Sequence, residues 1–148
     1  MGRLRALRRL RAVARRVRHR GRSGLGPGLV RTDLRGSDLA AGATAGLLRV
    51  TDPPTAIFAA RDVVTIGAIR ALRARGLHHS IALVGFDDFP LADLLEPAVT
   101  VIRRDVPGIG RAAAGRLFAR IDGDRTPSRT VVVPTTYLPR GSGELRAP

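Results

Sequence analysis

The sequence predicts an α/β fold of three layers, in which helices flank a mostly parallel sheet. Two observations lead to this class. Short apolar runs of the kind found in strands buried on both faces alternate along the chain with longer segments of helical periodicity. The segment from Pro54 to Pro90 also has the order strand, helix, strand, loop, which predicts a right-handed crossover between two parallel strands. At 148 residues the chain is long enough for one such domain.

The chain begins with an arginine-rich segment. Residues 1–22 contain ten Arg and no acidic residue, so most of the net charge of +14 lies here. An amphipathic helix is expected over residues 3–20, because apolar side chains gather on one side of a helical wheel: Ala6, Leu7, Leu10, Val13, Ala14 and Val17. The basic residues are all Arg and none is Lys, a bias that favours a solvated helix face over a nucleic-acid-binding arm.

The next elements are defined by turn residues. A Gly-rich loop at 21–28 is followed by a predicted strand at 29–33. Ser37 or Asp38 can cap a helix over 39–50, although two glycines weaken it. The Asp-Pro-Pro sequence at 52–54 then ends that helix.

The central unit has clear boundaries. Residues 55–59 form an apolar run that predicts a buried strand. Asp62 stands where a helix N-cap is expected, the helix covers 63–75, and Gly76 occupies the position at which a left-handed residue ends a helix. Residues 81–84 predict a second buried strand.

Two acidic residues, Asp87 and Asp88, follow this second strand at its carboxyl end, where open α/β sheets bind ligands. Neighbouring side chains point apart, so the two do not form a catalytic pair of carboxylates. A carboxylate at such a place can accept two hydrogen bonds from vicinal sugar hydroxyls or from an amine. Asp88 is expected to cap the turn ahead of Pro90.

The C-terminal part contributes further elements of both kinds. A strand is predicted at 100–103 and a helix at 107–122, with Pro in its first turn. Short strands are predicted at 130–133 and 136–138, and a polar tail over 141–148 is expected to be disordered.

Several classes of function are disfavoured by what the sequence lacks. It has no Cys, its three His show no metal-ligand spacing, and no phosphate-binding glycine loop, nucleophile elbow or catalytic triad order is present. We therefore expect no enzyme, no catalytic residues, no metal and no cofactor. No apolar run reaches the length of a membrane span and the N-terminus is too charged for a signal peptide, so a cytoplasmic protein without membrane contact is expected.

The segments TAIFAARD, IGAIRALRARGL and IALVGFDDFPLADLLEPAVTVIRRD resemble the effector-binding domain of the LacI/GalR family of bacterial transcription repressors, and the match extends over residues 9–140. The resemblance implies a partial periplasmic-binding-protein-like fold of type I, with residues 23–140 forming its C-terminal lobe. The helix-turn-helix headpiece and the first lobe are not visible, which suggests a truncated or mis-started sequence. Residues 105–127 are then expected to pack on the first lobe.

The resemblance also assigns an effector site. Asp87 matches the effector-binding Asp of the family, and Arg9 stands where the family carries an effector-contacting Arg, with a surface Arg as the alternative. Arg61 is a departure, because the family has Asn there and Arg can only donate hydrogen bonds. Either the effector carries a negative group that Arg61 pairs with, or the pocket has diverged and binds nothing.

A homodimer is the second implication. The central helix has more apolar surface than one sheet contact needs, and the family uses it, with the short helix after the aspartate pair, for dimerisation. Here the short helix corresponds to residues 91–95. The interface residues are then Val63, Ile66, Ile69, Leu91, Leu94 and Leu95. The alternative is burial of this helix between the sheet and other helices of its own chain.

The function implied is the effector-binding part of a DNA-binding transcription regulator. A sugar or similar small polar molecule is the expected effector, and operator DNA is bound through a headpiece that is not visible here. Two alternatives remain open: a transport-type sugar-binding protein of the same fold, and a basic nucleic-acid-binding protein that acts through the Arg-rich arm.

Overall fold

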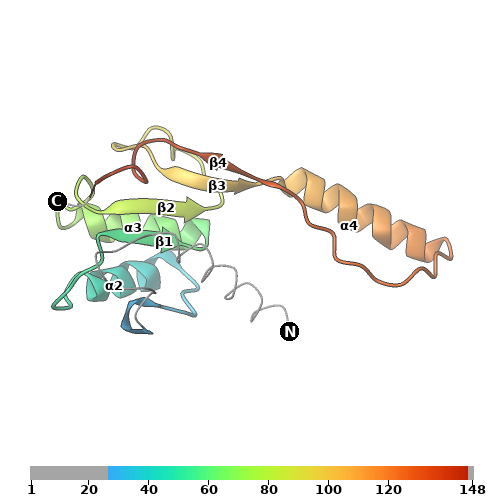
Figure 1. The fold of residues 1–148 in the computed structure, drawn as a ribbon, viewed down its shortest axis with the longest axis horizontal. Coiled ribbons are helices and arrows are strands. Elements are labelled where there is room, and N and C mark those ends of the chain that lie inside the picture. The colour runs from blue at the N-terminus through green and yellow to red at the C-terminus, as the bar shows by residue number, and fades with distance from the viewer. Residues whose placement is uncertain (1–26, 147–148) are drawn as a thin grey trace. The chain divides into compact units, whose positions relative to one another are not determined.

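The computed structural model describes residues 27–146. The expected Arg-rich helix and Arg9 lie outside these residues. The short 3-10 helix η1 (Pro27–Leu29) belongs to the first of two units of the chain, and the remaining elements belong to the unit that begins at Leu34. In chain order these elements are α2 (Ser37–Leu47), β1 (Ala56–Ala59), α3 (Asp62–Arg73), β2 (Ala82–Phe86), β3 (Thr100–Arg104), α4 (Val106–Ile121) and β4 (Thr135–Leu138) (Figure 1).

The four described strands form one sheet in the order β1-β2-β3-β4 (Figure 1). β1, β2 and β3 are parallel, and β4 is antiparallel to β3. The register places Val84 of β2 between Phe58 of β1 and Thr100 of β3. A mostly parallel sheet with α3 as the crossover between β1 and β2 confirms the predicted α/β class.

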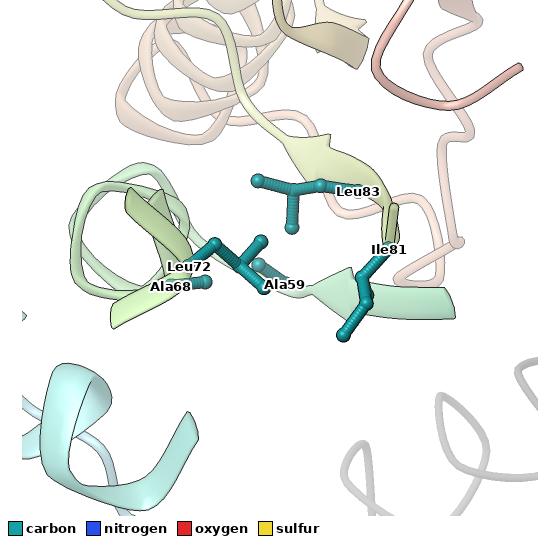
Figure 2. Packing of buried hydrophobic residues seen from close by; sticks show 5 residues of the cluster. All are labelled: Ala59, Ala68, Leu72, Ile81 and Leu83. Carbon is teal, nitrogen blue, oxygen red and sulfur yellow. The ribbon is translucent and has the colours of Figure 1, made fainter. Parts of the chain in front are cut away.

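The core between α3 and the sheet consists of small aliphatic side chains. Figure 2 shows Ala68 and Leu72 of α3 facing Ala59 of β1 and Leu83 of β2. Leu72 is among the largest side chains that are fully buried, with 2% of its surface exposed. Full burial of a Leu side chain such as Leu72 contributes about 1.5–3 kcal/mol to stability.

α2 packs on α3 through a very close contact at Gly67. A Cβ atom at this position would lie 2.3 Å from the carbonyl oxygen of Ser37 and 2.5 Å from Cβ of Ala40. Ala40 is itself fully buried. Gly67 is therefore required by the distance between two helix backbones and not by its own backbone conformation.

We expect Gly67→Ala to lower the free energy of unfolding by about 1–3 kcal/mol, the usual cost of overpacking. The matched control is Gly42→Ala in α2, where an added Cβ has nothing within 4 Å. There the higher helix propensity of Ala is expected to leave stability unchanged or raise it by up to about 1 kcal/mol. Urea unfolding of both variants provides the measurement, and a Gly67→Ala variant as stable as Gly42→Ala would contradict the close contact.

The segment that contains Ser142 completes the sheet at the start of β2 and β3. The amide of Leu83 donates to the Ser142 carbonyl at 2.8 Å, and the amide of Ser142 donates to the Ala98 carbonyl at 3.0 Å. The Ser142 hydroxyl donates to the Leu83 carbonyl at 2.7 Å and accepts from the Thr100 amide at 2.9 Å. Only 3% of Ser142 is exposed, so residues 141–146 are ordered, contrary to the disordered tail expected from the polar composition.

Ser142→Ala removes a buried hydroxyl and leaves the Thr100 amide and one lone pair of the Leu83 carbonyl without this partner. The expected cost is about 1–3 kcal/mol in the free energy of unfolding. Ser80→Ala at an exposed position is the control and is expected to change stability by less than about 0.5 kcal/mol. Chemical denaturation of the two variants decides between an integrated segment and a tail that contributes nothing.

Three predicted elements are wrong. Residues 29–33 form no strand: Leu29 ends η1, residues 30–33 have no regular secondary structure, and Asp33 has a left-handed φ of 61°. Residues 130–133 have strand-like composition but pair with no strand of the described chain. Residues 91–95 form a turn in place of a short helix, because Leu91 has a φ of 69° that no right-handed helix accommodates.

α4 has no buried residue, although it begins with a regular cap in which the Asp105 carboxylate accepts from the Gly108 amide at 2.9 Å. Its large apolar side chains are exposed: Val106, Ile109, Leu117, Phe118 and Ile121. The packing of residues 105–127 on another lobe stays a prediction. None of the described helices combines the length and the apolar character that crossing a membrane requires.

Candidate ligand-binding site

An open hollow of about 460 Å³ lies where β1, β2 and β3 reach their carboxyl ends. The junction of β1 with α3, the residues that follow β2, and the junction of β3 with α4 contribute its lining. The lining residues are Arg61, Asp62, Asp87, Asp88, Arg103, Arg104 and Val106. Six of these seven carry charge, so the hollow suits a small polar ligand.

Asp87 is the residue directly after β2 and adopts a left-handed backbone with φ of 76°. Asp and Asn tolerate this conformation better than most residues. Its carboxylate accepts hydrogen bonds from both Nε and Nη2 of Arg104, the latter at 2.6 Å, which is a bidentate pair. The hydrogen bond with Asp87 raises the pKa of Arg104, whose guanidinium also lies 5.9 Å from the ring centre of Phe86.

Asp88 faces a different partner. Its two carboxylate oxygens accept from Nη1 and Nη2 of Arg140 at 2.7 and 2.8 Å, and one of them also accepts from the Phe89 amide at 3.1 Å. The hydrogen bond from Arg140 is the main reason why the pKa of Asp88 lies below its usual value. The two adjacent carboxylates thus pair separately, in agreement with the prediction that they point apart.

The Asp88–Arg140 pair predicts a pH-dependent stability. A carboxylate whose pKa is lower in the folded state stabilises the fold above its unfolded pKa of about 3.9 and loses that contribution as the pH falls through the folded value. Asp88→Asn is therefore expected to be less stable than the parent near pH 7, and the difference is expected to shrink toward about pH 3. Urea unfolding at several pH values measures it, and a difference that is independent of pH would contradict the pairing.

Arg61 lies at the N-cap position of α3 with an extended backbone, and its carbonyl accepts from the Thr65 amide and hydroxyl, both at 2.9 Å. Asp62, predicted as the cap, is instead the first helical residue, and its carboxylate accepts from the Val63 amide at 2.7 Å. The guanidinium of Arg61 is exposed and makes no hydrogen bond or ion pair with any residue of the described part of the chain.

The structure thus brings together two of the three predicted effector residues, Asp87 and Arg61, whereas Arg9 lies outside the described residues. Their assignment to an effector stays a prediction. Sequence reasoning missed Arg103 and Arg104, which share the lining, and Arg140, which holds Asp88. The position of Arg104 at the end of a neighbouring parallel strand was a usable signal, because carboxyl ends of parallel strands share one edge of a sheet.

The residues predicted for a dimer interface have different environments. Ile69 packs against the core shown in Figure 2 and against a second buried cluster made of Ala92, Val99 and Val101, and Leu95 packs against this second cluster. Val63 and Ile66 are half-buried. Leu91 and Leu94 are 65% and 76% exposed. The exposed pair is available for an interface, and the dimer itself stays a prediction. Within residues 27–146, no group of three or more His, Asp or Glu side chains is arranged to hold a metal ion.

Comparison with known proteins gives consistent similarities. The family profile of the periplasmic binding protein-like domain matches residues 4–143. The chain is 39% identical over 90 residues to the HTH-type transcriptional regulator MalR of Streptomyces coelicolor, covering 60% of the chain and 26% of that protein. It is 38% identical over 102 residues to a lactose operon repressor of Rhizobium radiobacter, covering 66% of the chain and 88% of that sequence.

A solved structure shows the same similarity in three dimensions. It is a LacI family transcriptional regulator of Arthrobacter sp. FB24 in complex with lactose, with a TM-score of 0.63 and 28% identity, covering 74% of the chain and 42% of that protein. The chain spans about a quarter of the length of MalR and less than half of the lactose-bound protein.

Proposed function

The chain belongs to the LacI family of bacterial transcription regulators and contains part of its periplasmic-binding-protein-like domain; from this we propose that the hollow at the carboxyl ends of β1, β2 and β3 binds a small polar effector. In a full-length regulator, effector binding would shift the balance between two conformers and so change the affinity of a dimer for operator DNA. Such a regulator acts on DNA in the cytoplasm, and its effector domain carries out no catalytic step.

The observation that carries this proposal is the position of Asp87. Its carboxylate lies in the lining of the hollow directly after β2, with 19% of its side chain exposed. The carboxylate has more acceptor positions than the two that Arg104 occupies, so it can accept further hydrogen bonds from ligand hydroxyls. The charge-assisted bonds of such a carboxylate are stronger than those between neutral groups.

A transport-type sugar-binding protein of the same fold would have the same site geometry. It would differ from a regulator in serving sugar transport and not transcription. The relatives support regulation, because the similar proteins named above are transcription regulators. A nucleic-acid-binding role for the Arg-rich arm concerns residues outside the described part of the chain and has no support from the hollow.

The test replaces the matching part of a LacI-family regulator with residues 4–143 of this chain and measures operator release against a panel of sugars and sugar derivatives. Lactose is the first probe because it is bound in the Arthrobacter structure. Release by at least one compound is the expected result. A folded chimera that binds its operator and responds to nothing in the panel would contradict the proposal.

A further inference from the structure

The ion pairs in and around the hollow leave two of its guanidinium groups beside one carboxylate. Its lining has three Arg and three Asp side chains, and Arg140, from outside the lining, pairs with Asp88. The bidentate pair with Arg104 occupies Asp87, and the pair with Arg140 occupies Asp88. Two guanidinium groups, those of Arg61 and Arg103, therefore remain beside the single remaining carboxylate of Asp62.

Neither of these two guanidinium groups has a hydrogen-bonding partner among the described residues. Arg103 acts on Asp88 only through its charge. The carboxylate of Asp62 accepts from the adjacent Val63 amide, so it is held at the start of α3. Arg61, at the start of α3, thus has five N–H donors with no acceptor within residues 27–146.

This arrangement constrains what the hollow can bind. A ligand that covers Arg61 removes water from a full positive charge, and hydroxyl groups of a neutral sugar compensate only part of that loss. A carboxylate or a phosphate compensates for more of it, because either group is charged and can accept two parallel hydrogen bonds from the planar guanidinium. The free charge therefore favours an anionic ligand over a neutral one of the same shape.

We propose that the ligand of this hollow is a polyhydroxylated small molecule that carries a carboxylate or a phosphate, with the anionic group bound by Arg61 and the hydroxyl groups by Asp87. This inference rests on the proposed function, since it names the ligand class of the same site. Arg103 adds long-range attraction for the anion, and Arg104 keeps the carboxylate of Asp87 oriented toward the hollow.

The experiment uses the 148-residue chain, labelled with ¹⁵N, and follows amide shifts during titration, which detects binding as weak as millimolar. The probes are matched sets that differ at one position of the sugar: glucose, glucuronate and glucose 6-phosphate, and galactose, galacturonate and galactose 6-phosphate. At least one anionic member is expected to bind about tenfold or more tightly than its neutral counterpart, the effect of a charge-assisted hydrogen-bonded pair. The better of the two anions tells a sugar acid from a sugar phosphate.

Three variants assign the effect to Arg61. Arg61→Asn is expected to abolish the preference for the anion, and Arg61→Lys to keep part of it, because Lys retains the charge but not the bidentate geometry. Arg125→Asn removes an exposed Arg outside the hollow and is expected to leave the preference unchanged.

The outcomes separate this inference from the proposed function. Binding of neutral sugars with equal or greater affinity would overturn the anionic ligand and leave an effector site in place. An anion preference that survives Arg61→Asn would also overturn it. If no member of either set binds the folded chain, the inference is overturned, whereas the effector site itself is decided separately by operator release from the chimera.

Discussion

Asp87→Asn is expected to lower effector affinity at least about tenfold and to remove the effector response of a regulator that contains this chain, without unfolding it. Asn fits the left-handed backbone of this position as Asp does, so the substitution removes the charge and keeps the shape. The loss has two sources: a neutral amide forms weaker hydrogen bonds with ligand hydroxyls, and Arg104 loses its bidentate partner. Ligand titration of the parent and variant chains measures the affinity.

Two further substitutions make this result specific. Asp88→Asn is expected to reduce stability more than effector affinity, since the Asp88 carboxylate is engaged by Arg140. Asp93→Asn, at an exposed position outside the hollow, is expected to change neither property. Equal losses of affinity from Asp87→Asn and Asp88→Asn would show that the ligand contacts lie elsewhere.

Leu72→Ala is expected to produce the largest loss of stability, about 2–5 kcal/mol, because it opens a cavity between α3 and the sheet. Domains of this size have total stabilities of about 5–15 kcal/mol, so the variant is expected to be marginally folded or unfolded. The matched control, Leu94→Ala, removes the same atoms from a side chain that is 76% exposed and is expected to cost less than about 0.5 kcal/mol.

Circular dichroism during urea unfolding gives both free energies. Equal stability of the Leu72→Ala and Leu94→Ala variants would mean that the cluster shown in Figure 2 is not the stabilising core. A cost for Leu94→Ala above about 1 kcal/mol would instead indicate that Leu94 is covered in solution, as the predicted dimer interface requires.

The elements that the sequence predicts correctly are those whose local signals agree with their packing. The apolar runs of β1 and β2 and the helical segment of α3 each combine an apolar pattern with a clear stop, such as Gly76 after α3 with its left-handed φ of 66°. Residues 130–133 show the opposite case. Their β-branched composition suits a strand, but a strand exists only where a neighbour supplies hydrogen bonds, and β3 pairs with residues 135–138 instead.

The residues of the candidate site also differ in whether the sequence predicts them. The place of Asp87 was predictable because it follows a locally recognisable strand and ligands bind at the carboxyl ends of such strands, whereas Arg61 was singled out only by the family resemblance. The partners of the two carboxylates were not predictable, since Arg140 lies 52 residues from Asp88 in the chain and no local pattern joins them. Only once these ion pairs are known does it become apparent that Arg61 and Arg103 have no carboxylate partner of their own in the described part of the chain.

The hydrogen bonds of Ser142 determine when the sheet can be completed while the protein is being synthesised. The amide of Leu83 finds its partner 59 residues later, and the amide of Thr100 finds its partner 42 residues later. While a ribosome is still adding residues before position 142, the sheet cannot close at the start of β2 and β3, and these amides must stay hydrated or bind a chaperone. The nascent chain therefore completes this part of the sheet only after residue 142 has been synthesised, which exposes β2 to aggregation until then.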